Sequence, residues 1–227
     1  MLGIIVAMST EFTLVEASMT EKESKKIHGI DFLCGKIGDK SIVLCQSGIG
    51  KVNSAVKTVE MILNFNPKAI INTGVAGGID ATLNVMDIVV STEVCYHDVW
   101  CGEGNVIGQI QDMPDRFVAN ENLLKTALAA NTDVVIRQGL ICSGDQFITD
   151  GEQLSQIKMN FPDGIAVDME SASIAHVCYL YNTPFLSCRI LSDTPGKDED
   201  NFNQYLDFWA LAPEKAVSLL KSIITKL

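Results

Sequence analysis

Short apolar runs rich in Val and Ile alternate with amphipathic segments along nearly the whole chain, and this alternation constrains the fold more than any other feature. Continuous apolar runs of this length are typical of strands buried on both faces. The segments between them repeat apolar residues at helical spacing. We expect strands at 3–8, 30–37, 41–47, 69–74, 87–96, 134–143, 164–169 and 185–193, and helices at 11–19, 52–64, 120–130, 151–159, 169–181 and from about 203 to 227.

Strands covered by helices predict an α/β fold, here a three-layer α/β/α domain with a central mixed β-sheet. The sheet should be mixed because only three residues, 38–40, separate the runs 30–37 and 41–47, which predicts an antiparallel hairpin. No linker, repeat or low-complexity segment interrupts the pattern. We therefore expect residues 1–227 to form one domain.

The composition argues against several classes of protein. A net charge of −11 argues against nucleic acid or an anionic membrane as a partner. No apolar run is long enough to span a membrane, and the run 3–8 is too short for a signal peptide. A hydrophobic fraction of 47% predicts a large core and an apolar surface covered by a partner subunit.

The cysteines predict reduced core thiols in a cytoplasmic protein. All seven are scattered without a CxxC pair, and most lie inside apolar runs. Only Cys101 has the setting of an exposed loop. The three histidines, His28, His97 and His176, lie far apart in the sequence, so we expect no metal site.

Three glycine-bearing segments, 46–55, 71–79 and 142–148, follow expected strands. Neither a Walker A sequence nor GxGxxG is present. Tight turns would explain each segment alone, but three together predict a crevice lined by backbone. Two loops after strands, 97–117 and 194–203, are either ligand-binding loops at the same edge or plain surface loops.

Acids also follow three of the expected strands: Glu11, Glu170 and Asp193. Each acid alone can be explained by helix capping, with Ser9 or Thr10 as the N-cap in the case of Glu11. Three acids at one edge of a sheet favour a hydrolytic site. Arg189 lies inside an apolar strand and needs an acidic or phosphate-like partner there, for which Glu11 and Asp193 are the candidates.

Seven segments in this order, GIIVAMSTE, SGIGKVNSA, INTGVAGG, DIVVSTEVCYHD, GLICSGDQFI, FPDGIAVDMESASIAHVC and PFLSCRILSD, make nearly the whole chain resemble one family. It is the 5′-methylthioadenosine/S-adenosylhomocysteine nucleosidases of the nucleoside phosphorylase superfamily. The resemblance implies a homodimeric enzyme that hydrolyses the N-glycosidic bond of adenine thionucleosides. It implies no metal or organic cofactor.

The resemblance also implies the catalytic roles. Glu11 matches the acid that activates water, Asp193 the acid that protonates N7 of adenine, and Glu170 the acid that binds the ribose hydroxyls. Cleavage builds positive charge on the ribose and negative charge on the purine, so carboxyl groups suit both ends of the bond. We therefore expect substrate binding to be the main role of Glu170 and helix capping to be a secondary one.

Further residues are expected to bind substrate. The resemblance implies that Met169 packs beside the ribose, that Phe147 stacks on the base and that the backbone of Ile148 reads the adenine edge. It also implies that Arg189 and Ser192 orient the water and Asp193. Ile49 and Tyr205 complete the expected binding residues, Tyr205 matching a family phenylalanine beside the 5′ group.

The sequence departs from the family at the 5′ pocket, where Trp100 and Cys101 replace part of the usual lining, and at Asp168, where Glu is usual. Asn72 occupies the place at which phosphorylase relatives carry a phosphate-binding arginine. Three alternatives stay open: a purine nucleoside phosphorylase, a nucleosidase for another 5′-modified adenosine such as aminofutalosine, and a silent nucleoside sensor. Three retained acids argue against the sensor.

Overall fold

A computed structural model describes residues 1–130, 135–195, 203–206, 208 and 213–226. The strands are β1 Leu2–Val6, β2 Thr20–Ile27, β3 Ile30–Ile37, β4 Lys40–Gln46, β5 Ile70–Gly78, β6 Ile88–Tyr96, β7 Phe117–Val118, β8 Ile136–Ser143, β9 Gly164–Asp168 and β10 Phe185–Asp193. The helices are α1 Ser9–Ala17, α2 Lys51–Phe65, α3 Glu121–Leu128, α4 Gly151–Asn160, α5 Ser171–Leu180 and α7 Pro213–Lys226. All of the described strands belong to one mixed sheet.

The sheet is open at one end and closed on itself at the other. From β5 it continues through β1, β4 and β3 to the edge strand β2. On the other side β5 pairs with both β9 and β10, and β6 and β8 join those two strands, so that five strands form a ring. The ring brings strand ends that are far apart in the sequence to one place.

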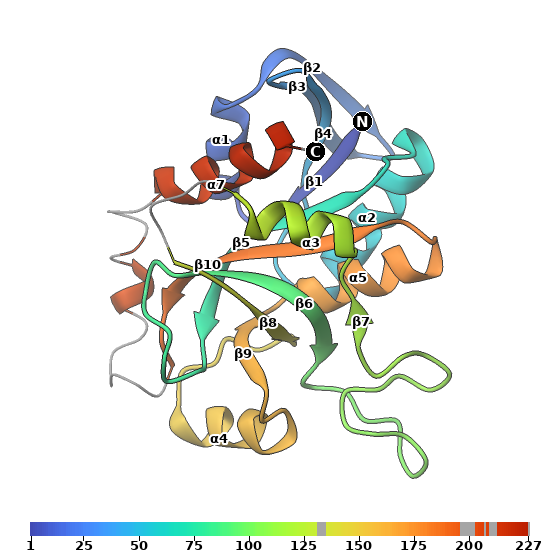
Figure 1. Cartoon of the computed structure of the whole chain (residues 1–227). Helices are drawn as coiled ribbons and strands as arrows, with labels where there is room; N and C mark the ends of the chain where they lie inside the picture. The colour runs from blue at the N-terminus through green and yellow to red at the C-terminus, as the bar shows by residue number, and fades with distance from the viewer. Residues whose placement is uncertain (131–134, 196–202, 207, 209–212, 227) are drawn as a thin grey trace.

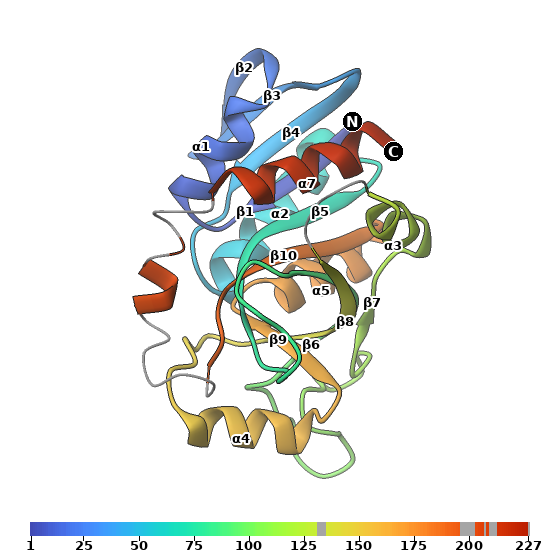
Figure 2. The same cartoon turned by 60° about the vertical axis from the view of Figure 1, so that its left-hand side comes forward.

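Helices cover both faces of the sheet (Figures 1 and 2), which confirms the three-layer prediction. Strand residues alternate between the two faces. Ile4 of β1 packs in the cluster that includes α1, α3 and α7, while its neighbour Ile5 packs in the cluster with α2 and α5. Among the described helices, none is long and apolar enough to cross a membrane.

All eight expected strands form, and the antiparallel hairpin of β3 and β4 is confirmed. Two strands were not predicted: β2, whose residues are nearly all exposed and polar, and the two-residue β7. The segment 71–79 was expected to follow a strand, but β5 continues through it to Gly78. Much of the expected loop 194–203, residues 196–202, and parts of the last expected helix, residues 207, 209–212 and 227, lie outside the described residues.

Six of the seven cysteines are buried and free, and Cys101 is exposed, as predicted.

Candidate active site

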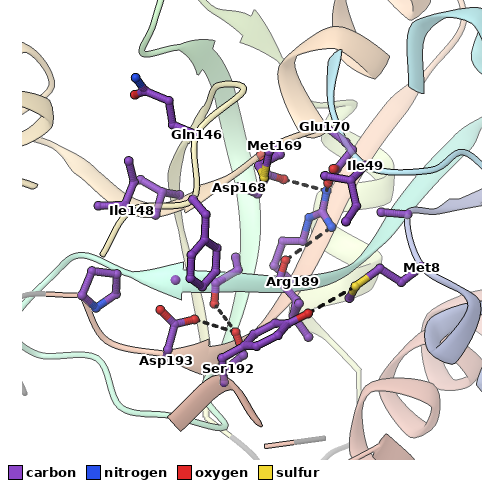
Figure 3. A pocket seen from close by; sticks show the side chains of 18 of the residues that line it. Met8, Ile49, Gln146, Ile148, Asp168, Met169, Glu170, Arg189, Ser192 and Asp193 are labelled. Carbon is purple, nitrogen blue, oxygen red and sulfur yellow. Dashed lines mark hydrogen bonds and ion pairs between the residues drawn. The ribbon is translucent and has the colours of Figure 1, made fainter. Parts of the chain in front are cut away.

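One cavity lies beside β5, at the ends of β1, β9 and β10 and against the loop after β8. Figure 3 shows side chains from several separate segments pointing into it. Its lining comprises Ala7, Met8, Glu11, Ile49, Val75, Ala76, Gly77, Gln146, Phe147, Ile148, Val167, Asp168, Met169, Glu170, Arg189, Ser192, Asp193, Pro195 and Tyr205.

All ten residues that the sequence nominated for the site line this cavity. Trp100 and Cys101, expected to shape the 5′ pocket, are exposed and do not line it in the single chain.

Glu11 lies in the first turn of α1, which begins directly after β1. Met8 is the N-cap, not Ser9 or Thr10 as expected. Glu11 Oε2 accepts hydrogen bonds from the backbone N–H groups of Ala7 (2.8 Å) and Met8 (2.9 Å), and Oε1 accepts one from Val75 (3.1 Å). Burial raises the pKa of Glu11, while Arg189 and these N–H donors act in the opposite direction.

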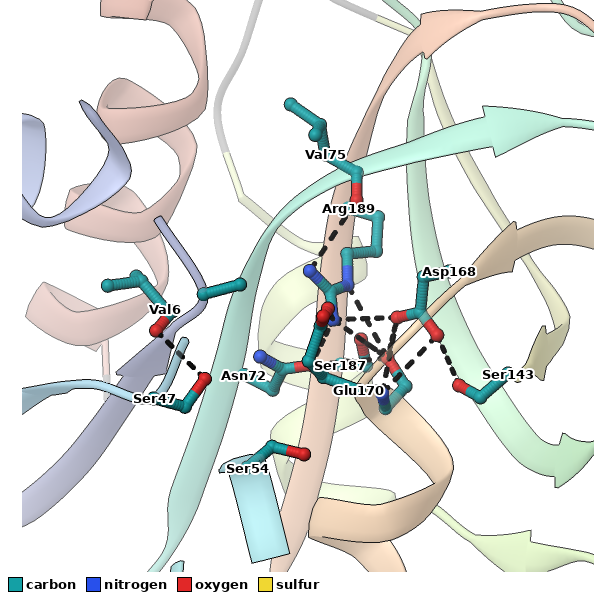
Figure 4. A network of polar contacts seen from close by, with 12 residues as sticks. Val6, Ser47, Ser54, Asn72, Val75, Ser143, Asp168, Glu170, Ser187 and Arg189 are labelled. Carbon is teal, nitrogen blue, oxygen red and sulfur yellow. Dashed lines mark hydrogen bonds and ion pairs between the residues drawn. The ribbon is translucent and has the colours of Figure 1, made fainter. Parts of the chain in front are cut away.

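Arg189 is buried in β10, and Asp168 and Glu170 from the β9–α5 segment compensate its charge (Figure 4). Arg189 Nη2 lies 2.6 Å from Asp168 Oδ2 and 3.5 Å from Glu170 Oε2. An acidic partner was predicted correctly, but the ion pairs do not involve Glu11 or Asp193, because the ring brings β9 to the side of β5, the strand with which β10 pairs.

Asn72 completes this network from β5. Its side-chain oxygen accepts hydrogen bonds from Arg189 and Ser171, and its Nδ2 donates to the Ile5 carbonyl at 3.0 Å. Asn72 therefore helps to hold Arg189 through Nη2, the same guanidinium nitrogen that pairs with the two acids.

Glu170 is the N-cap residue of α5, yet its side chain makes no capping hydrogen bond to that helix. Asp168 caps the helix instead, since its carboxylate accepts a hydrogen bond from the Ser171 N–H at 3.3 Å. Glu170 Oε1 instead accepts from Gly50 N–H at 3.0 Å, across the cavity wall. Burial raises the pKa of Glu170 to about 7, and the nearby negative charges of Asp168 and Glu11 add to the shift, against Arg189.

Asp193 ends β10 at a bulge and is buried. Ser192 Oγ donates to Asp193 Oδ1 at 2.7 Å, which fixes the orientation of the carboxyl group.

Aromatic and sulfur-containing side chains also line the cavity. The ring of Phe147 is 43% exposed and meets Tyr205 edge-on, with 5.7 Å between the ring centroids. Tyr205 Oη donates to Met8 Sδ at 3.3 Å. A flat apolar ring and buried acids in one cavity suit an aromatic base attached to a polar ring.

Sequence reasoning missed some of the lining. Met8, Gln146, Val167 and Pro195 each lie within three residues of a nominated residue, so proximity in sequence was an available signal. Among the described residues, no group of three His, Cys, Asp or Glu side chains is arranged to hold a metal ion.

Comparison with known proteins agrees with this geometry. The model of the phosphorylase superfamily matches residues 1–225. A 5′-methylthioadenosine/S-adenosylhomocysteine nucleosidase of Psychromonas ingrahamii is 43% identical over 231 residues, covering 100% of this chain and 99% of that protein. The chain belongs to this nucleosidase family of the phosphorylase superfamily.

Solved structures of family members share the fold over their whole length. A nucleosidase from Colwellia psychrerythraea in complex with adenine has a TM-score of 0.93 at 36% identity, covering 100% of this chain and 95% of that one. The Neisseria meningitidis nucleosidase in complex with methylthio-immucillin-A has a TM-score of 0.94 at 34% identity, covering 100% and 99%.

Proposed function

We propose that this chain hydrolyses the N-glycosidic bond of 5′-methylthioadenosine and S-adenosylhomocysteine and releases adenine. The observation that carries the proposal is the convergence of Glu11, Glu170 and Asp193 on one cavity. The names of its relatives, and the adenine bound to one of them, support the same substrates.

Each acid is held in a way that suits a distinct step. Glu11 has a raised pKa and can take a proton from water near the ribose. Asp193, oriented by Ser192, donates a proton to N7 of the departing adenine. Glu170, fixed by the Gly50 N–H, accepts hydrogen bonds from the ribose hydroxyls.

Water is a better nucleophile than phosphate in this cavity. A phosphate dianion would meet the carboxylates of Glu11 and Glu170, while the guanidinium of Arg189 is already paired with Asp168. Asn72 carries no charge that could offset this repulsion. Phosphorolysis is therefore disfavoured.

A second candidate is hydrolysis of another 5′-modified adenosine. Two observations favour it: neither Trp100 nor Cys101 lines the cavity of the single chain, and Tyr205 brings a hydroxyl group to Met8. A more polar 5′ group could bind beside that hydroxyl.

The deciding experiment follows free adenine by chromatography. Purified protein is incubated with methylthioadenosine, S-adenosylhomocysteine, adenosine or aminofutalosine, with and without phosphate. We expect adenine release that is independent of phosphate and fastest with the two thionucleosides. Release only with phosphate would identify a phosphorylase, and a preference for aminofutalosine would favour the second candidate.

Substitutions of the two proton-transfer residues test the mechanism. Glu11→Gln and Asp193→Asn keep the shape of each side chain but remove its proton chemistry. We expect each to lower kcat by at least about 100-fold, with a thermal unfolding midpoint close to that of the wild type. A wild-type kcat in either variant would exclude that residue from the reaction.

We also propose that the chain acts as a homodimer. Helices α2 and α5 pack together and expose large apolar side chains, among them Val52 and Leu63 of α2 and Leu180 of α5. Lys51 at the start of α2 binds Asp98, two residues before the 64%-exposed Trp100. A second copy would cover this surface, and Trp100 could then complete the cavity of the partner.

The proposed reaction uses water and carboxyl groups alone, so it requires no metal or organic cofactor. The six buried free thiols suit a reducing compartment, and we propose a cytoplasmic protein. The charge of −11 favours a small-molecule substrate over nucleic acid or membrane.

A further inference from the structure

The N-terminus of α2 holds two carboxylates that come from distant segments. Its N-cap residue, Gly50, has no side chain to cap the helix, and its first turn contains no acid. Gly50 N–H donates to Glu170 Oε1 at 3.0 Å, and the next N–H, of Lys51, donates to Asp145 Oδ1 at 2.8 Å. One helix end thus binds both the carboxylate proposed to hold the ribose and a carboxylate outside the cavity.

Asp145 is held in turn by Asp98. Its backbone N–H donates to Asp98 Oδ2 at 2.9 Å, and the same oxygen accepts from Lys51 Nζ at 2.7 Å. The three residues form a closed circuit: the backbone of Lys51 binds Asp145, the backbone of Asp145 binds Asp98, and the side chain of Lys51 binds Asp98. They come from the α2 start, the loop after β8 and the loop after β6.

Two glycines make this approach possible. A Cβ atom on Gly50, which has φ +95°, would lie 2.9 Å from Asp145 Oδ1. A Cβ atom on Gly144 would overlap the buried ring of His97 and lie 2.9 Å from Asp98 Cγ. Without a Cβ atom at either position, the loop after β8 packs directly against the start of α2 and against His97 and Asp98.

Asp145 precedes the residues proposed to bind the base. Gln146 alone separates it from Phe147, and Ile148 follows. Phe147 and Ile148 line the cavity, whereas Asp145 does not. The N-terminus of α2 therefore connects the base-binding loop, through Asp145, to the ribose-binding acid, through Gly50.

We infer that Asp145 is a positioning residue that sets the base-binding loop at a fixed distance from Glu170, through the N-terminus of α2. It contacts no substrate itself. Reaction at the bond between base and ribose requires both halves of the substrate to be held together, and a misplacement of about 1 Å can cost on the order of 100-fold in rate. The inference rests on the proposed function for the identity of the two halves.

Three variants separate positioning from general stability. Asp145→Ala removes the acceptor of the Lys51 N–H, while Asp145→Asn keeps a side-chain oxygen there. Asp150→Ala is a control, because Asp150, the N-cap residue of α4, also accepts from N–H groups in the first turn of a helix, those of Glu152 (2.9 Å) and Gln153 (2.8 Å). Both alanine variants lose one helix cap, so their unfolding midpoints should fall by similar amounts.

The kinetic readout is adenine release from methylthioadenosine. We expect Asp145→Ala to lower kcat/KM by about 10-fold or more, Asp145→Asn to recover most of it, and Asp150→Ala to match the wild type. Equal losses in the two alanine variants, or no loss in Asp145→Ala, would overturn the inference.

A binding readout does not depend on turnover. Calorimetry compares adenine, which occupies only the base half, with a non-hydrolysable methylthioadenosine analogue, which spans both halves. Asp145→Ala should weaken binding of the analogue by about 10-fold and binding of adenine much less. Only the analogue needs the base-binding and ribose-binding halves of the site at the correct distance from each other. Equal weakening would refute positioning. If the wild type released no adenine but this contrast remained, the hydrolase proposal alone would fail.

Discussion

At the scale of single residues, a buried guanidinium determines the electrostatics of the cavity. Arg189 is surrounded by Asp168, Glu170 and Glu11, and all four side chains are buried. Asp168 makes the short ion pair at 2.6 Å, so Glu170, at 3.5 Å, is held less tightly and can still accept from a ligand. The pKa of Glu170, raised to about 7 by burial first, means that its charge is sensitive to pH near neutrality.

Asp168→Asn should shift the pH dependence of nucleoside binding. The negative charge of Asp168 raises the pKa of Glu170, so removing that charge lowers the pKa of Glu170. Arg189 is then free to pair more closely with Glu170, which lowers this pKa further. An ionised carboxylate is the stronger acceptor for the ribose hydroxyls. Wild-type affinity for a non-hydrolysable analogue should therefore weaken as pH falls below about 7, and the variant should weaken only at lower pH.

Calorimetry from about pH 5 to pH 9 measures this shift, with adenine alone as the control ligand, since adenine does not reach Glu170. An acid limb that stayed in place, or moved to higher pH, would contradict the assigned interaction.

Part of this network of charged side chains could be predicted from the sequence. A buried arginine predicted an acidic or phosphate-like partner, and three acids after three strands favoured one shared site over three separate helix caps. The sequence could not reveal that Asp168 and Glu170 are the partners, because that depends on which strands lie side by side. Asp145 gave no signal either: its role depends on a contact with Lys51, 94 residues away.

At the scale of the elements, β5 brings backbone close to Glu11. Gly74 lies within β5, and a Cβ atom there would overlap the Glu11 carboxylate and lie 2.7 Å from Arg189 Nη1. The absence of a side chain at Gly74 thus leaves room inside β5 for the side chains of Glu11 and Arg189.

Gly74→Ala should displace Glu11 and lower kcat by on the order of 100-fold, even though the substitution adds one methyl group. Gly151→Ala is the control, because a Cβ atom on Gly151 has nothing within 4 Å. Steady-state kinetics and thermal unfolding of both variants measure the effect. Full activity in Gly74→Ala would mean that Glu11 tolerates displacement and does not need this geometry.

Elements with a strong apolar pattern were predictable, and those without one were not. The sequence of β2, TEKESKKI, has no apolar alternation, because this edge strand pairs only with β3 and exposes nearly all of its side chains. The extension of β5 was missed because glycines usually mark the end of a strand, whereas here they admit Glu11 and other neighbours.

At the scale of the whole molecule, closure of five strands into a ring collects residues 7 to 205 around one cavity. Strand order is set by long-range pairing, which local sequence patterns do not encode. The glycine segments and acids after several strands predicted a shared edge, but the pairing that closes the ring had no signal in the sequence.

The exposed apolar surface over α2 and α5 predicts that two copies of the chain assemble through it. Exposed apolar patches of this kind mark interfaces, and a charge placed within one must be desolvated when a second copy binds. Light scattering of the wild type should give twice the 24.7 kDa of one chain. Val56→Glu, on the exposed side of α2, should shift the population to monomer. Met159→Glu on α4 should stay dimeric, because Met159 is also exposed but lies outside the α2–α5 surface.

Activity then distinguishes an interface that builds the site from one that only stabilises the fold. If Trp100 completes the partner's cavity, the Val56→Glu monomer should bind adenine normally, because Phe147 and Asp193 belong to the same chain. It should lose affinity for methylthioadenosine, whose 5′ group would lack its cover. A wild-type protein that is monomeric at assay concentration, yet fully active on methylthioadenosine, would show that the single chain holds a complete site.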